Sequence, residues 1–495
     1  MKRIIAVFLA LLMMISVCSC EIGKKNSDDT DASNVATSDF DGTKIVASTE
    51  NYSISFAELD YIFADTYNSM LYNYYSTFQD SYADYILYYT GLDINKPLKD
   101  QTMNDGSGTF FDYYLEVSAE KANDILIFCE YAKENGLDLD DDDREYIDGL
   151  IDTYKQQTEA NNCTFAEIFE DSMGLITEEV VRSYSEKNIL AGKGYNFLKE
   201  TYSFTDEEVE AEFNANLKNY AYISYLVYTF QNDETAGITA EDIKTYSEEL
   251  SAVTTEEEFI AYCENYHNNV LYKDMESHPE FSKDNLLKER IGYSKDTDYL
   301  DKLFEGKAGY TFVTENTGDD FTSYNVYMLV GEPSELNYSK VDVRHILFKS
   351  ANYESTDACR KAAEDIYALY KQNPTEDNFA ALANKYSEDT YTDENGNQTI
   401  AEEGGLIKDI GYNETVKDFE NWALDPSRQV GDTDIILSTL GYHIVYFSAV
   451  GEKQTPGHDA AKNALISQRY EKDHEELKTK YAVTADKEYM ANLNY

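Results

Sequence analysis

The chain has 495 residues, which is too long for one compact core, so two to four domains are expected. Its formal net charge is −53, with 94 Asp and Glu residues against 41 Lys and Arg residues. A surface this acidic repels phosphate backbones, which argues against nucleic acid as a partner, and it keeps a protein in solution.

The first residues have the pattern of an export signal that ends in a lipidation site. A short basic start precedes an uncharged, mostly apolar run over 4–17, which is too short to span a bilayer comfortably. The sequence VCSC then resembles a bacterial lipobox, and Cys20 fits the acylated position because the small Ser19 precedes it. We therefore predict a lipoprotein signal peptide over 1–19 and an extracytoplasmic protein anchored to the cell membrane through Cys20. An ordinary secretory signal is the alternative.

Residues 20–43 are rich in Ser, Asp, Asn and Thr and show no apolar periodicity, so we expect a disordered tether there. The cysteines beyond the tether do not have the spacing of a C-x-x-C pair or a zinc site. We expect them to be mostly buried free thiols. They are Cys129, Cys163, Cys263 and Cys359.

Residues 44–218 are predicted to be mainly helical. Thr177 and Thr205 are expected N-caps, each followed by acidic residues in the first helical turn. The sequence TDEE from Thr205 has the spacing of a capping box. The acidic run over 140–143 also indicates a helix start, because its Asp, Gly and Glu residues do not fall at the intervals of a calcium loop.

The stretch 341–450 has a different pattern, in which β-branched and aromatic runs enclose segments with helical spacing. This order of strand, helices and hairpin predicts an α+β domain. The expected elements are a strand at 341–348, helices around 358–369, 379–386 and 419–424, and strands at 434–439 and 442–450.

Two histidines, His345 and His443, lie inside predicted strands of this domain. A single strand histidine is usually a hydrogen-bonded core residue, but two in one small domain point to a shared site. With the carboxylate of Asp389 they suggest a metal site, a catalytic triad or a polar network. A metal is disfavoured because no closely spaced ligand pair exists, and a triad lacks a nucleophile elbow. No metal or other cofactor is predicted.

The same stretch resembles the parvulin family of peptidyl-prolyl isomerases. The sequence VRHIL at 343–347 matches the family's opening strand, and 379–389 matches its F-x-x-L-A-x-x-Y-S-x-D segment. Gly-Gly-Leu at 404–406, Phe-Glu at 419–420 and Gly-Tyr-His-Ile at 441–444 follow in the family order. We therefore predict a parvulin-type domain over residues 336–452.

The resemblance implies catalytic roles for four residues. His345 and His443 correspond to the paired histidines under the catalytic groove. Asp389 occupies a position that is Cys in some parvulins and Asp in many bacterial ones. Ser438 lies where a hydroxyl group joins the histidine network.

The resemblance also implies a proline pocket, with Phe419 as its aromatic floor and Leu406 as its apolar wall. Thr415 stands where family members often carry Met, and the usual G-G-D-L-G reads GGLIK at 404–408. These departures bear on catalytic efficiency more than on the fold. The loop 390–403 has part of the spacing of an EF-hand but lacks the first Asp, so calcium is not expected.

Residues 219–335 repeat the layout of this domain. Strand-like runs at 222–227 and 323–332 correspond to its first and last strands, with Ser224 and Asn325 in place of the two histidines. We hypothesise a degenerate parvulin-like domain that keeps the fold and has lost the site. An unrelated α+β segment is the alternative.

The remaining helices resemble the chaperone region of PrsA/SurA-type foldases, in which N-terminal helices and a C-terminal helix, here 453–495, form one peptide-binding unit. The whole chain is thus expected to be α+β. The resemblance implies a prolyl isomerase and chaperone that acts on unfolded or partly folded exported polypeptides with X-Pro bonds. The alternative is a non-catalytic holdase with the parvulin domain as a scaffold. A homodimer is left open, and a solute-binding lipoprotein would need a two-lobed α/β pattern that the sequence lacks.

Overall fold

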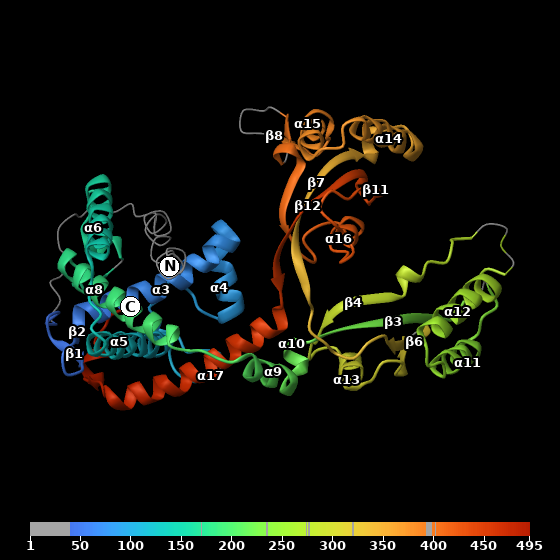
Figure 1. Ribbon diagram of the computed structural model, residues 1–495. Coiled ribbons are helices and arrows are strands. Elements are labelled where there is room, and N and C mark those ends of the chain that lie inside the picture. The colour runs from blue at the N-terminus through green and yellow to red at the C-terminus, as the bar shows by residue number, and fades with distance from the viewer. Residues whose placement is uncertain are drawn as a thin grey trace. The chain divides into compact units, whose positions relative to one another are not determined.

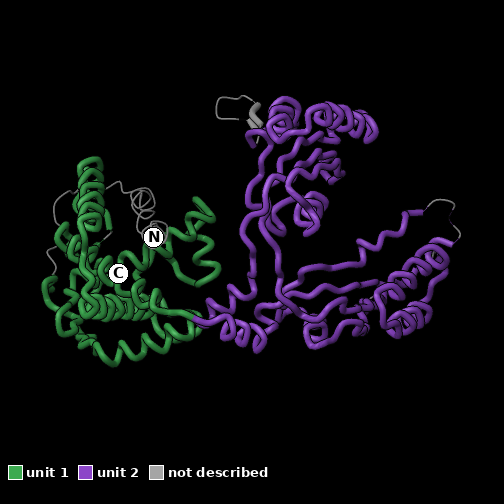
Figure 2. Tube along the Cα trace, in the orientation of Figure 1, with its two compact units in different colours: residues 1–203, 466–495 green, residues 204–465 purple. Residues whose placement is uncertain are grey.

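The computed structural model describes residues 40–169, 171–233, 236–273, 275, 278–318, 321–392, 398–400 and 402–495. The chain divides into unit 1, which comprises the residues up to 203 together with 466–495, and unit 2, which comprises 204–465 (Figure 2). The short helices after residue 203 and the first turns of the C-terminal helix therefore belong to unit 2. The predicted signal peptide, Cys20 and most of the tether lie outside the described residues.

Unit 1 is built mainly from helices (Figure 1). A small antiparallel sheet has the order β13-β1-β2. Among the described helices, none combines the length and apolar character needed to cross a membrane. The elements are β1 (Ile45–Ser48), β2 (Ser53–Ser55), α3 (Phe56–Phe78), α4 (Tyr82–Thr90), α5 (Phe110–Glu134), α6 (Asp141–Asn161), α7 (Phe165–Ile168), α8 (Glu178–Glu200), the C-terminal part of α17 (Pro456–Lys480), β13 (Thr484–Ala485) and α18 (Lys487–Met490).

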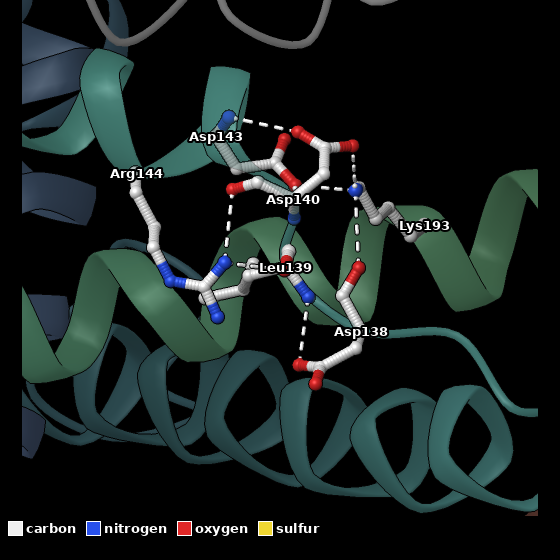
Figure 3. A network of polar contacts seen from close by, with 6 residues as sticks. All are labelled: Asp138, Leu139, Asp140, Asp143, Arg144 and Lys193. Atoms are coloured by element: carbon white, nitrogen blue, oxygen red, sulfur yellow. Dashed lines mark hydrogen bonds and ion pairs between the residues drawn. The ribbon is translucent and has the colours of Figure 1, made fainter.

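The start of α6 shows how the acidic run is used (Figure 3). The carboxylate of Asp140 accepts a hydrogen bond from the N–H of Asp143 at 3.0 Å, and the Asp143 carboxylate accepts one from the N–H of Asp140 at 2.9 Å. Lys193 of α8 forms ion pairs with both carboxylates. The predicted helix start is confirmed, as are the N-caps at Thr177 and Thr205.

The C-terminal segment completes the core of unit 1. The ring of Tyr495 stacks on Phe63 with 4.3 Å between centroids, and its hydroxyl donates to the buried Asp60 at 2.8 Å. His474 of α17 stacks on Phe128 of α5. The final residues are therefore ordered by burial of aromatic surface, which is the dominant stabilising term in such a core.

In unit 2, a four-stranded antiparallel sheet has the order β10-β7-β12-β11 (Figure 1). Helices α14 and α15 pack on one face of it and α16 packs on the other. The strand, helix and hairpin order predicted for 341–450 is confirmed. The elements are β7 (Tyr338–Lys349), α14 (Thr356–Gln372), α15 (Glu376–Tyr386), β8 (Thr390–Thr392), β9 (Gln398–Ile400), β10 (Leu406–Ile410), α16 (Lys417–Ala423), β11 (Thr433–Leu437) and β12 (Gly441–Gln454).

A second four-stranded antiparallel sheet in unit 2 has the order β4-β3-β6-β5. Helices α11 and α12 pack on one face and α13 on the other. Element by element, this is the order and strand pairing of the first sheet. The elements are α9 (Asp206–Ala215), α10 (Leu217–Tyr220), β3 (Tyr222–Gln231), α11 (Ala240–Ser251), α12 (Glu256–Tyr266), β4 (Leu287–Gly292), α13 (Asp298–Glu305), β5 (Thr311–Thr317) and β6 (Thr322–Leu329).

The two sheets also share an irregularity in their outer strands. In β10, the three steps from 407 to 410 face two steps of β7, and Asp409 inside this bulge has a φ of 56°. In β4, the three steps from 288 to 291 face two steps of β3, and Arg290 at the same place has a φ of 54°. A bulge adds one unpaired residue to a strand. The shared bulge therefore gives a common reference point from which residues of one sheet can be matched to residues of the other.

The match between the two sheets corrects the expected correspondence of Ser224 to His345. Counted from the bulge, the residue of β3 that lies level with His345 is Val227 rather than Ser224. Ser224 is three positions away, so it faces the other side of the sheet, because strand side chains alternate. Asn325 keeps its expected place, level with His443.

His458 joins three segments of unit 2 near the start of α17. Its Nε2 lies 2.8 Å from a carboxylate oxygen of Glu210 in α9, and its Nδ1 contacts Glu335, which precedes β7. The ring stacks on Phe213 at 4.5 Å. The N–H groups of Gly457 and His458 also donate to Glu335, at 3.1 and 2.8 Å.

We expect this contact to make stability depend on pH. Burial alone would lower the pKa of His458, but hydrogen bonds to Glu210 and Glu335 outweigh it and raise the pKa above 6.5. The contribution is therefore fully present below pH 6.5 and is lost as the pH rises through the folded-state pKa. His458→Gln should lower the free energy of unfolding, measured by urea denaturation, more at pH 6 than at pH 9. The difference should be at most about 1 kcal/mol because the group is partly exposed.

His278→Gln is the matched control, since no carboxylate lies within ion-pair distance of that ring among the described residues. A His458→Gln effect of the same size at both pH values would contradict the expectation.

Candidate functional site

The two central strands of the first sheet bring His345 and His443 together. His345 in β7 pairs with Val445, and His443 in β12 pairs with Leu347, so the histidines are diagonal neighbours on one face. Their Nδ1 atoms are 3.3 Å apart, and the residues are only 5% and 3% exposed. The spacing of a diagonal pair suits direct contact between side chains of this length.

Asp389 and Ser438 extend this pair at its two ends. Nε2 of His345 lies 3.2 Å from a carboxylate oxygen of Asp389, and Nε2 of His443 lies 2.8 Å from Oγ of Ser438. The structure therefore joins all four predicted catalytic residues in one line, Asp389, His345, His443 and Ser438.

Ser387 places the carboxylate end of the line. Its Oγ accepts hydrogen bonds from the N–H of Leu347 at 3.2 Å and from the N–H of Asp389 at 3.3 Å. The N–H of Glu388 also donates to the carbonyl oxygen of Leu347 at 2.8 Å. The end of α15 is thus fixed to β7, which holds Asp389 beside His345.

Burial affects the pKa values of the residues in the line. It lowers the pKa of His443 to about 4, helped by the neighbouring His345 and opposed by Asp389. The hydrogen bond with His345 lowers the pKa of Asp389, against the effect of burial. At neutral pH, Asp389 is therefore ionised and His443 is neutral.

Two arrangements of protons are compatible with a neutral His443, and in the first of them each ring carries one proton. His345 donates from Nε2 to Asp389 and accepts at Nδ1 from the Nδ1–H of His443. The hydroxyl of Ser438 then donates to Nε2 of His443. In the second arrangement both nitrogens of His345 carry a proton, so His345 donates to Nδ1 of His443 and Nε2–H of His443 donates to Ser438. Hydrogen bonds connect the whole line in both arrangements.

Phe419 of α16 covers the histidine pair. Its ring centroid is 5.7 Å from that of His345 and 5.6 Å from that of His443, in edge-on geometry. It belongs to a buried apolar cluster with Val343 and Val445, and Ile407 packs against that cluster.

The structure does not bring Leu406 into this cluster. Leu406 pairs with Arg344, whose side chain points to Glu376 at the start of α15, whereas Ile407 pairs with Val343 on the face of the histidines. The apolar wall beside Phe419 is therefore Ile407. Without the register between β10 and β7, the sequence does not distinguish Ile407 from Leu406. Ser387 was part of the matched motif without an assigned role.

Thr415 lies just before Val416, the N-cap of α16. Its hydroxyl oxygen is buried and has no hydrogen-bond partner among the described residues. Val416 packs against the cluster of Phe419. Thr415 is thus at the edge of the predicted pocket, four positions before Phe419, and contributes an unsatisfied polar atom there.

The glycine pair is required by the close approach of its loop to β7. Gly405 has a φ of +65°, and a Cβ at this position would lie 2.1 Å from the carbonyl oxygen of His345. No side chain fits there. Among the described residues, no cluster of potential metal ligands exists, and the part of the loop at 393–397 that prompted the calcium question lies outside them.

The four cysteines carry no disulfide bond in the structure, and Cys163 alone among them is only half-buried. This agrees with the prediction of mostly buried free thiols.

The low pKa of His443 predicts a loss of stability in acid. The unfolded histidine takes up its proton near pH 6.5 and the folded one only near pH 4, so stability falls as the pH drops between these values. The fall should approach about 3 kcal/mol. His443→Gln should remove this part of the slope in urea unfolding at pH 7, 5.5 and 4.5. An unchanged slope in this variant, with His278→Gln as control, would contradict the assignment.

Comparisons with known proteins match the region of the chain that contains the site residues. A family model described as "Rotamase: PPIC-type PPIASE domain" matches residues 345–449. The foldase protein PrsA 3 of Bacillus cereus is 36% identical over 132 residues, which are 26% of this chain and 38% of that protein. The foldase protein PrsA of Caldanaerobacter subterraneus is 28% identical over 180 residues, 36% of this chain and 49% of that protein.

The chain thus spans less than half the length of these curated relatives. A crystal structure of the peptidylprolyl isomerase PrsA from Bacillus cereus aligns with 62% of this chain and 91% of that chain, at 17% identity. Its TM-score of 0.18 is too low to support a statement about the fold. The predicted resemblance is confirmed at the level of the domain: the chain carries a PPIC-type rotamase domain of the parvulin type and is distantly homologous to PrsA foldases.

Proposed function

We propose that the protein catalyses cis–trans isomerisation of X-Pro bonds in exported polypeptides and also holds these polypeptides as a chaperone. The observation that carries the proposal is the line from Asp389 through His345 and His443 to Ser438, which lies under the ring of Phe419. This combination places an apolar surface for a proline ring beside a hydrogen-bonded polar network.

The chemistry needs no covalent step. Rotation about an amide costs about 18–20 kcal/mol because resonance must be broken. A dry pocket that holds the proline ring favours the twisted amide, which has less charge separation than the planar one. Phe419 and Ile407 supply such a surface, since both belong to or pack against one buried cluster.

The polar line sets the electrostatics where the substrate carbonyl turns. Its groups are buried and hydrogen-bonded, so they need little reorganisation when the amide twists. Because Asp389 is ionised and His443 neutral, a negative charge lies at one end of the line before a substrate arrives. Uncatalysed isomerisation takes tens to hundreds of seconds, so even modest stabilisation shortens folding.

A non-catalytic holdase is the second candidate, and the surface of α4 favours a holding role. Leu87, Tyr88 and Tyr89 are 49%, 80% and 60% exposed, and Tyr85 stacks on Phe78 beside them. Tyrosine presents a flat apolar body with a polar tip, which suits contact with varied unfolded chains. In this reading the parvulin-type domain serves only as a scaffold.

We also propose that 219–335 is a degenerate parvulin-like domain. The shared strand order, the shared bulge and the two helices on one face against one on the other support this. At the levels of the two histidines this region has Val227 and Asn325, so it lacks the polar line. Its role in the proposal is structural.

Replacing the pocket ring should reduce catalysis. Because Phe419 is buried, the variant will also lose stability, so its activity is measured under conditions in which it is shown to be folded. Phe419→Ala is expected to lower kcat/KM for a proline-containing peptide at least tenfold, which corresponds to about 1.4 kcal/mol of transition-state stabilisation. His443→Ala should cause a loss of similar size. Both variants are measured in a cis–trans isomerisation assay and in refolding of a protein limited by proline isomerisation.

Phe321→Ala, at an exposed position, and His278→Ala are the matched controls and should keep full activity. Suppression of aggregation is measured in parallel, because the holding role predicts that Phe419→Ala retains it. A wild-type protein that suppresses aggregation but does not accelerate isomerisation would establish the holdase instead.

Attachment to the outer face of the cell membrane through Cys20 is part of the proposal. In cells fed a labelled fatty acid, the wild-type protein should take up label and sediment with membranes. Cys20→Ser should abolish the label and release the protein, whereas Cys18→Ser should keep the label because Ser19 still precedes Cys20. Label that persists in Cys20→Ser, or is absent from the wild type, would contradict the anchor.

A further inference from the structure

A buried ion pair joins the second sheet to the helix that carries Phe419. Glu420 of α16 is 2% exposed, and one of its carboxylate oxygens lies 3.0 Å from Nη2 of Arg290 in β4. The N–H of Asn413 donates to the other carboxylate oxygen. Among the described residues, Arg290 is the only cation within ion-pair distance of Glu420. A buried carboxylate that loses its partner is strongly destabilising, so α16 depends on Arg290.

The backbone conformation of β4 at Arg290 directs the guanidinium toward Glu420. Arg290 occupies the bulge of the strand with a φ of 54°, a left-handed conformation that is unusual for a residue other than glycine. A bulge re-aims the side chain it carries. The guanidinium also lies over the ring of Tyr412, 4.1 Å from its centroid, and 3.8 Å from Glu289. The ring and Glu420 together fix its orientation, since Arg stacks on aromatic faces as well as pairing with carboxylates.

Glu420 is one residue from the pocket. Phe419 precedes it in α16 and covers both histidines at 5.7 and 5.6 Å between ring centroids. The helix is short, and its buried residues Phe419, Trp422 and Ala423 pack on the sheet in one cluster. A displacement of the helix at Glu420 therefore moves the ring of Phe419 against the histidine pair, because packed interiors transmit such shifts.

We infer that Arg290 is a positioning residue for the isomerase site, and that the sheet formed by β3 to β6 thereby sets the geometry of the proline pocket. The inference rests on the proposed function for its catalytic consequence. With this role, the second sheet contributes to the isomerase site although it lacks the two histidines. This role also means that the parvulin-type domain alone, without Arg290, carries an uncompensated carboxylate beside its pocket.

The fluorescence of Trp422 is a direct probe of the position of α16. Trp422 is the single tryptophan of the chain, it lies in α16, and it is buried near Phe447. Its fluorescence therefore reports α16 alone in the full-length protein. Arg290→Ala should shift its emission to longer wavelength and increase its quenching by acrylamide, whatever the catalytic activity.

Arg290→Ala should weaken substrate binding more than it slows the catalytic step. This substitution disturbs Phe419 but leaves in place Asp389, which follows α15, and the two histidines of β7 and β12. We expect KM for a proline-containing peptide to rise about fivefold while kcat changes less than twofold, since an interaction lost equally in ground and transition states raises KM alone. A general loss of folded protein would instead lower the apparent kcat and leave KM unchanged.

Two further variants test whether the effect passes through Glu420. Glu420→Gln keeps the shape of the side chain without the charge, so in Arg290→Ala/Glu420→Gln both Trp422 emission and KM should return toward wild type. Arg290→Lys should lie between wild type and Arg290→Ala, and it replaces Arg290→Ala in all measurements if that variant does not fold. Arg360→Ala, on the exposed side of α14 with Asp357 and Glu364 nearby, is the matched control and should change neither reading.

The outcomes separate the two proposals. Wild-type Trp422 emission and KM in a folded Arg290→Ala protein would overturn the positioning role, even if the protein is an active isomerase. An inactive wild-type protein would overturn the proposed function, and the Trp422 readings would still decide whether Arg290 positions α16. No return in the double variant would show that Arg290 acts other than through Glu420, which also overturns the inference.

Discussion

The pairing of β7 with β12 is the constraint on which the site depends. The two strands run antiparallel from the pair Gly441–Lys349 to the pair Gln454–Tyr338, although about a hundred residues separate them in the chain. Because side chains alternate, a slip of one residue would turn a histidine from the face of α16 to the face covered by α14 and α15. Gly441 allows the pairing to begin, since a Cβ there would lie 2.0 Å from the carbonyl oxygen of Phe348. The register of this pairing therefore determines which side chains share the face on which the site is built.

The second sheet shows that this architecture does not require the polar line. Its face toward α13 carries a stack of rings, with Tyr327 4.7 Å from Tyr299 and 5.0 Å from Phe312, and the hydroxyls of Tyr225 and Tyr299 are 3.1 Å apart. These rings bury apolar area on the face that carries the histidines in the first sheet. A shared strand order and a shared bulge therefore coexist with different chemistry, which is why function is argued from the site and not from the fold.

Local signals in the sequence account for what could be predicted. The cap at Asp140 and the motif residues His345, Asp389 and His443 were identified because each depends on a few neighbouring positions. The choice between Leu406 and Ile407 depends on the exact strand register after a glycine pair with positive φ, which no propensity indicates. The Ser224 equivalence failed for the same reason, because similarity of residue types does not fix register. The pairing of Arg290 with Glu420 spans 130 residues and leaves no local pattern at all.

The charge composition explains why such distant pairs matter here. With 94 acidic and 41 basic residues, most carboxylates have no cation to pair with and stay in solvent, where their repulsion is screened by salt. Two of the buried carboxylates receive cations from distant segments: Glu58 of α3 pairs with Lys187 of α8, and Glu420 pairs with Arg290. Other buried carboxylates, such as Asp171, accept hydrogen bonds from backbone N–H groups instead. Salt screens the two buried ion pairs far less than it screens exposed charges. Loss of one such cation therefore leaves a buried charge that no neighbour can compensate, whereas loss of an exposed carboxylate relieves repulsion. In this chain the few cations at buried carboxylates hold the helices in place, and one of those helices carries the pocket.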